Sequence, residues 1–140
     1  MLQEYFWSKL DKSHHHIIPA ELGAEQGASS YRDLTDRIEF DIAFLGMGED
    51  GHTASLFPEN EALNDTRSVI PVYDSPKPPS DRISMSKYTL KQIPNKVVLV
   101  SGNGKAMIIK RIQSGESLPI NNIGDIDWFI DEDANTYKAL

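Results

Sequence analysis

The chain lacks cysteine, long apolar runs and clusters of basic residues, and each absence excludes a class of protein. Without cysteine it can form neither disulfides nor thiolate sites. Apolar runs such as Val97–Val100 are far shorter than the ~18 residues that a membrane helix requires. The formal net charge is -7, whereas nucleic-acid backbones are bound by concentrated Lys and Arg. We therefore expect neither a membrane nor a nucleic acid as a partner.

The composition that remains is that of an ordinary globular domain. Hydrophobic residues make up 39% and charged residues 25% of the 140 positions, which disfavours disorder. The length fits a single domain over 1–140. The N-terminal MLQEYFWSKL has neither the basic nor the apolar region of a secretory signal, so a cytoplasmic location is expected.

Hydrophobic periodicity predicts an α/β fold. Helical spacing predicts helices, which we place at 2–10, 24–37, 87–93, 105–112 and 132–140. Short apolar or alternating runs predict strands, which we place at 40–45, 68–73, 82–86, 96–100 and 127–131, the first of them buried. Two successive units of strand, glycine loop and helix are typical of a parallel sheet. With about three or four strands such a sheet is small, so we expect an exposed strand edge and a chain that is a fragment.

A glycine-rich loop follows the first predicted strand, at the edge of a parallel sheet where ligands bind. Gly46, Gly48 and Gly51 permit positive φ angles and a close approach of a ligand to the backbone. They are therefore candidate substrate-binding residues.

His52 ends this loop and is the candidate catalytic residue. An unperturbed imidazole has a pKa near ~6.5, in the range for taking a proton from water at neutral pH. The neighbouring Asp50 and Glu49 are placed to hold the ring in one tautomer. The alternative is that His52 is an exposed or capping loop residue without a chemical role.

The loop also matches the dinucleotide-binding spacing G-x-G-x-x-G. That site needs a helix after the last glycine. A helix beginning at Thr53 or Ser55 would be ended by Pro58, which leaves little helix to pack on the sheet. A dinucleotide site is therefore disfavoured.

Metal and serine chemistry are disfavoured as well, and we expect no cofactor. Consecutive residues such as His14–His16 do not share a face, and no second cluster has the spacing of metal ligands. Ser55 lacks the G-x-S-x-G context of a nucleophilic serine.

Two cations follow other predicted strand boundaries. Arg82 comes after the proline-rich loop Asp74–Ser80, and Lys105 comes after the glycine-rich Ser101–Gly104. Facing the same crevice as His52, a guanidinium and an ammonium would suit a phosphate group. Their alternative is an ordinary role as surface cations.

Longer segments resemble the 6-phosphogluconolactonase family. The stretch Phe40–Pro58, FDIAFLGMGEDGHTASLFP, closely resembles the signature of that family. Asp74–Ser86 resembles its proline loop and Arg-Ile-Ser segment, and Val100–Lys105 resembles its G-x-x-K strand end. Leu118–Pro119 and Trp128–Asp131 follow in the expected order. The resemblance covers nearly the whole chain.

The resemblance implies a Rossmann-like parallel sheet and hydrolysis of 6-phosphoglucono-δ-lactone. His52 would be the general base that activates water, with Asp50 beside it, and neither a metal nor a covalent intermediate would be involved. Arg82 and Lys105 would hold the phosphate or stabilise the oxyanion. The backbone of Gly46–Gly51 would line the sugar site.

The departures from the family are as informative as the match. The related glucosamine-6-phosphate deaminases continue the histidine as H-I-A-F-N-E-P, whereas this chain has His52–Pro58, HTASLFP. The family's N-terminal half, with its glycine-rich phosphate loop and Asp-Glu-Arg segment, has no counterpart in the sequence. We therefore expect the C-terminal portion of a lactonase, with self-association through the open sheet edge and, as the alternative function, sugar-phosphate binding without turnover.

Overall fold

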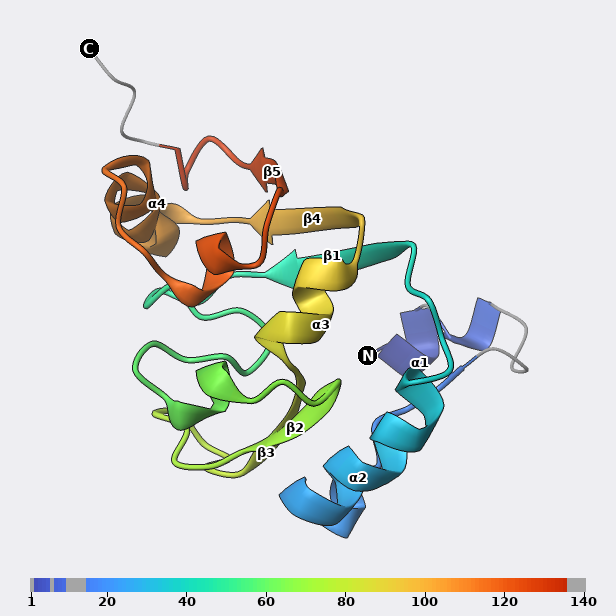
Figure 1. Cartoon of the computed structure of the whole chain (residues 1–140). Coiled ribbons are helices and arrows are strands. Elements are labelled where there is room, and N and C mark those ends of the chain that lie inside the picture. Colours follow the sequence, from blue (N-terminus) through green and yellow to red (C-terminus); the bar gives the residue numbers. More distant parts are fainter. Residues whose placement is uncertain (1, 6, 10–14, 136–140) are drawn as a thin grey trace.

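The computed structural model describes residues 2–5, 7–9 and 15–135 (Figure 1). The α-helices are α1 (Leu2–Tyr5), α2 (Ala24–Thr35), α3 (Lys87–Gln92) and α4 (Ala106–Gln113). The strands are β1 (Ile42–Gly46), β2 (Val69–Val72), β3 (Arg82–Met85), β4 (Asn95–Val100) and β5 (Asp127–Ile130). Single 3-10 turns are η1 (Trp7–Lys9), η3 (Ala20–Leu22), η4 (Glu61–Asn64), η5 (Asn103–Lys105) and η6 (Pro119–Asn122). No helix in these ranges is long and apolar enough to cross a bilayer.

The central element is a parallel three-stranded sheet in the order β1-β4-β5, which confirms the predicted α/β class (Figure 1). Its register places Gly46 beside Leu99, and Leu99 beside Phe129. The connection from β1 to β4 contains β2, β3 and α3, and the connection from β4 to β5 contains α4. The carboxyl ends of β1 and β4 are therefore neighbours, and both carry predicted site loops.

The strands β2 and β3 form a separate antiparallel pair rather than extending the parallel sheet. All four residues of β2 are buried. Helix α2 packs on this pair, and Arg32 fixes the contact by donating from Nη1 to the carbonyl of Val69 at 2.9 Å. Helix α2 thus covers the hairpin and leaves the parallel sheet to other elements.

The core lies on one face of the parallel sheet. Val98 of β4, Leu90 of α3 and Ile108 of α4 belong to the same buried cluster. The connection from β1 to β4 and the connection from β4 to β5 step across the sheet in the same direction. Parallel strands are joined by right-handed connections, and two such connections in the same direction cover the same face of the sheet.

The opposite face of the sheet is apolar and open, which corrects the prediction that the first strand is buried. Ile42, Phe44, Leu99 and Phe129 alternate with core residues along their strands, and their exposed fractions are 46%, 68%, 56% and 60%. Within the described ranges β1 pairs with β4 alone, so its outer edge is open as the sequence predicted. Strand β1 lies at the edge of the sheet, and other elements pack on one of its faces only. A hydrophobic run in the sequence does not distinguish this arrangement from burial on both faces.

Two short helices predicted from the sequence are absent from the described residues. Instead of a helix after Thr53, a tight turn closes through a bond from Leu56 N to Thr53 O at 2.8 Å, with Ala54 at a φ of 49°. Residues 132–135 form turns rather than a helix, and 136–140 lie outside the described ranges. The predicted opening helix corresponds to α1 and η1, with the remainder of 2–10 outside those ranges.

Candidate active site

The Gly46–His52 loop leaves the carboxyl end of β1 and folds back on itself. The N–H of Gly48 donates to the carbonyl of His52 at 2.8 Å, and the hydroxyl of Thr53 donates to the carbonyl of Gly46 at 2.9 Å. The carbonyl of Gly51 accepts from the N–H of Ile120 at 3.1 Å, which ties the loop to η6. The backbone that carries His52 is therefore braced on both sides.

Asp50 holds the ring of His52, as the sequence predicted. Nδ1 of His52 lies 2.6 Å from Oδ1 of Asp50, and the backbone N–H of His52 donates to the same oxygen at 3.1 Å. A carboxylate at Nδ1 favours the tautomer with its proton on Nδ1 and leaves the lone pair of Nε2 free. The His52 side chain is 18% exposed, so it is enclosed and still reachable by water.

The same contact keeps the Asp50 carboxyl ionised. Burial acts to raise its pKa, but the hydrogen bonds from the backbone and the ring of His52 outweigh burial and hold the pKa of Asp50 below its usual value. A carboxylate in this form accepts a hydrogen bond from Nδ1–H and stabilises an imidazolium when one forms.

The three loop glycines differ in backbone conformation and in the space around them, and their predicted role in substrate binding stays a prediction. Gly51 has a φ of +82°, and a Cβ there would lie 2.8 Å from Leu118 Cδ1. A Cβ on Gly48 would lie 2.0 Å from Nδ1 of His52, so the lack of a side chain at Gly48 leaves room for the His52 ring. A Cβ on Gly46 would meet no atom within 4 Å. Positive φ is thus required at Gly51 and not at Gly46 or Gly48.

Phe57 links His52 to Arg82 and was not singled out from the sequence. Its ring is 1% exposed and its centroid lies 4.4 Å from that of His52, with a 41° tilt between the planes. The guanidinium carbon of Arg82 lies 5.3 Å from the same Phe57 centroid. The candidate base and the candidate phosphate ligand therefore contact one buried ring, although they are far apart in the chain.

The guanidinium of Arg82 also braces the proline-rich loop. Its Nε donates to the carbonyl of Pro79 at 3.1 Å, and its Nη2 donates to the carbonyls of Lys77 at 2.8 Å and Pro78 at 3.3 Å. Arg82 is thus oriented by the loop before it, which fixes where its charge points.

Lys105 ends η5, which follows the carboxyl end of β4 after Ser101 and Gly102. The loops after β1 and β4 lie close together, because a Cβ built on Gly104 would be 3.3 Å from Glu49 Oε1. The structure therefore places His52 and Arg82 against Phe57 and Asp50 against His52, while Lys105 ends the turn that follows the neighbouring strand.

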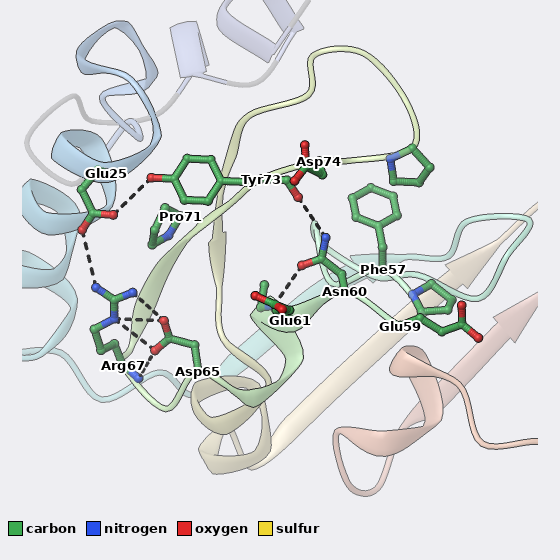
Figure 2. Close-up of a pocket in the computed structure, with 13 residues that line it drawn as sticks. Glu25, Phe57, Glu59, Asn60, Glu61, Asp65, Arg67, Pro71, Tyr73 and Asp74 are labelled. Atoms are coloured by element: carbon green, nitrogen blue, oxygen red, sulfur yellow. Dashed lines mark hydrogen bonds and ion pairs between the residues drawn. The ribbon is translucent and has the colours of Figure 1, made fainter.

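A cavity with mostly acidic charged side chains in its walls lies beside this site (Figure 2). Its volume of about 690 Å³ is in the range of small-molecule pockets. Its walls come from α2, β2, the 57–62 segment and the proline-rich loop, and they share Phe57 with the site. Arg67 in its wall is paired with Asp65 at 2.5 Å and with Glu25 at 3.6 Å, and Glu25 also accepts from the Tyr73 hydroxyl at 3.2 Å. This paired, mostly acidic wall does not suit a phosphate.

The described residues contain no group of three or more His, Cys, Asp or Glu side chains placed as metal ligands. Of the histidine triplet, His14 lies outside the described ranges. The carbonyl of His16 accepts a hydrogen bond from the hydroxyl of Tyr31 on α2 at 2.8 Å, so the backbone at His16 is bound to that helix.

Comparison with known proteins decides the family. The model of the family described as glucosamine-6-phosphate isomerases/6-phosphogluconolactonase matches residues 1–128. The chain belongs to this family. It is 37% identical over 128 residues to human 6-phosphogluconolactonase, a match that covers 84% of this chain and 50% of the human protein. It is 41% identical over 96 residues to a Drosophila melanogaster protein named as a probable 6-phosphogluconolactonase, covering 67% of this chain and 39% of that protein. The chain therefore spans about half the length of the curated relatives it matches.

Solved structures of the family show the same fold. The structure of a devB protein has a TM-score of 0.83 at 28% identity, covering 95% of this chain and 63% of the other. The 6-phosphogluconolactonase of Thermotoga maritima has a TM-score of 0.78 at 25% identity, covering 87% of this chain and 58% of the other. A monomeric glucosamine-6-phosphate deaminase has a TM-score of 0.66 at 22% identity, which shows the shared fold alone.

Proposed function

We propose that this chain is the C-terminal portion, a single α/β domain, of a 6-phosphogluconolactonase of the oxidative pentose phosphate pathway, and that it carries the base of that enzyme. The reaction is hydrolysis of 6-phosphoglucono-δ-lactone to 6-phosphogluconate. The observation that carries the proposal is the 2.6 Å contact between His52 and Asp50 at the carboxyl end of β1. The lactonase names of the relatives support the substrate class.

In the proposed mechanism His52 acts first as a base and then as an acid. Nε2 takes a proton from water as the water oxygen bonds to the lactone carbonyl carbon, and Asp50 stabilises the resulting imidazolium. When the tetrahedral intermediate collapses, the bond from that carbon to the ring oxygen breaks. The imidazolium returns its proton to the departing oxygen, which becomes a hydroxyl. The proposal assigns no step to a metal or cofactor.

The cations and the loop backbone complete the proposed site. Arg82 and Lys105 bind the phosphate or stabilise the developing oxyanion, a contribution of about 3 kcal/mol when such a donor is well placed. The orientation of Arg82 against Phe57 and the proline-rich loop favours a fixed anion contact. The backbone of Gly46–Gly51 lines the sugar site.

A second candidate function is binding of a sugar phosphate without turnover. It is favoured by the extent of the match, which covers 50% of human 6-phosphogluconolactonase. Deamination of glucosamine 6-phosphate is less well supported, because the residues after His52 read TASLFP. A cytoplasmic location remains a prediction, and the relatives include an Arabidopsis protein named as chloroplastic.

The test is hydrolysis of freshly generated 6-phosphoglucono-δ-lactone by the purified chain, followed by NMR above the spontaneous rate. We expect acceleration that His52→Ala abolishes and that His16→Ala, an exposed histidine outside the site, retains. Equal acceleration by wild type and His52→Ala would exclude His52 as the base. Binding of 6-phosphogluconate by a folded chain without acceleration would favour the second candidate.

A further inference from the structure

Asp131 joins two neighbouring strand ends through both of its carboxylate oxygens. It follows β5, and its backbone N–H donates to the carbonyl of Val100 at 3.1 Å. Its Oδ2 accepts from the hydroxyl of Ser101 at 2.5 Å and from the N–H of Gly102 at 3.0 Å. Its Oδ1 accepts from the N–H of Gly102 at 3.1 Å and from the N–H of Ala134 at 2.8 Å.

These bonds hold the segment that leads into Lys105. Gly102 has a φ of +90°, a conformation that L side chains rarely adopt, and its carbonyl accepts from the N–H of Lys105 at 3.0 Å. Asp131 therefore fixes the N–H of Gly102, and the N–H of Lys105 fixes its carbonyl.

The carboxylate is suited to this role in its ionised form. The hydroxyl bond from Ser101, followed by the N–H bonds from Ala134 and Gly102, lowers the pKa of Asp131 below its usual value. A charged acceptor makes stronger hydrogen bonds than a neutral one and can serve all of these donors at once.

We propose that Asp131 is a positioning residue for Lys105. It holds the Ser101–Gly102 segment at the carboxyl end of β4 and thereby fixes the position of Lys105. The proposal rests on the anion-binding role of Lys105 in the proposed function. Asp131 itself has no part in the chemistry. Its effect on ligand binding passes entirely through Lys105.

The experiment is a double-mutant cycle on the affinity for 6-phosphogluconate, measured by NMR titration of the intact chain. Asp131→Asn removes the charge and replaces one of the two acceptor oxygens with an amide NH₂ group, which leaves a single neutral oxygen to accept from Ser101, Gly102 and Ala134. We expect it to weaken binding about tenfold, within the range for residues that act on a site without touching its ligand. Lys105→Ala should weaken binding at least as much. Asp133→Asn removes the same charge at an exposed position two residues after Asp131, and it should leave the affinity unchanged.

The decisive comparison is Asp131→Asn in the Lys105→Ala background. No further loss of affinity there supports the proposal, because a clamp has no effect once the residue that it positions is gone. An equal loss in both backgrounds overturns it and would mean that Asp131 has a general structural role. A folded wild-type chain that binds no 6-phosphogluconate overturns it as well.

The proposed catalytic function can fail without affecting this result. Binding of 6-phosphogluconate does not require turnover, so a chain that binds but does not hydrolyse the lactone still reports on Asp131. Where turnover is present, Asp131→Asn should raise KM and leave kcat nearly unchanged, whereas partial unfolding would lower kcat.

Discussion

Oδ1 of Asp50 accepts from both the backbone N–H and Nδ1 of His52, a residue two positions further along the chain. One carboxylate oxygen therefore fixes the main chain and the ring of the proposed base together. Phe57 packs against the same ring at 4.4 Å between centroids. The ring is held in place before any ligand binds, which is the preorganisation that general-base catalysis requires.

Asp50→Asn should abolish most of the lactone hydrolysis while leaving the fold intact. The amide would present a donor to Nδ1, favour the tautomer with its proton on Nε2 and so remove the lone pair that accepts a proton from water. We expect kcat to fall about 10²- to 10⁴-fold, measured by NMR with freshly generated lactone. Asp125→Asn, at an exposed loop position, is the matched control, and a kcat within about twofold of wild type for Asp50→Asn would disprove the tautomer role.

Gly48→Ala should displace the His52 ring. The added Cβ would lie 2.0 Å from Nδ1 of His52 and 2.6 Å from Oδ1 of Asp50, so the contact between these side chains must break. We expect loss of hydrolysis and a changed His52 ring signal in NMR. Gly46→Ala is the structural control, because its Cβ meets no atom within 4 Å and its melting temperature should match wild type. An unshifted His52 signal in Gly48→Ala would contradict the close contact.

Local patterns were sufficient to predict most elements and the contact between Asp50 and His52. Strands β1, β4 and β5 coincide with apolar runs in the sequence. The contact between Asp50 and His52 lies within one short loop, so neighbouring residues determine its geometry. Helix α3 likewise begins at a local signal, with the Ser86 hydroxyl accepting from the N–H of Thr89 at 3.1 Å.

Contacts between distant segments could not be predicted in this way. No spacing rule in the sequence predicts the contact of Phe57 with Arg82 or that of Asp131 with Ser101, because each joins residues from separate segments. The predicted helix after Thr53 failed for the same reason. The Thr53 hydroxyl bonds to Gly46 O and the Ser55 N–H bonds to the Ser84 hydroxyl, and these tertiary bonds favour a turn.

Self-association remains a prediction, and the open sheet face indicates where it would occur. Phe44 is 68% exposed on the edge strand β1, beside other exposed apolar side chains. If copies associate through this face, Phe44→Asp should shift the chain toward monomer in sedimentation velocity over a concentration series. Tyr88→Asp, at an exposed aromatic residue on α3, should leave the distribution unchanged. A wild-type chain that is monomeric at every concentration would exclude self-association.

Asp65→Asn should make the stability of the chain less dependent on pH in the acid range. Hydrogen bonds from the Arg67 side chain, with further help from its backbone N–H and charge, outweigh burial and hold the pKa of Asp65 below its usual value. Because the folded pKa is the lower one, the pairing contributes its full stability above the unfolded pKa of about 4 and loses it as the pH falls through the folded pKa. Near neutral pH we expect the variant to be less stable by about 0.5 kcal/mol, since Arg67 is partly exposed.

Urea unfolding followed by tryptophan fluorescence, from neutral pH down to about pH 3, measures this difference. The gap in the free energy of unfolding between wild type and Asp65→Asn should narrow as the solution is acidified, because protonation removes the charge that the variant already lacks. Asp33→Asn, at an exposed position on α2, supplies the control for loss of a carboxylate. A gap that stays constant across the range would mean that Asp65 contributes through its shape and neutral hydrogen bonds rather than through its charge.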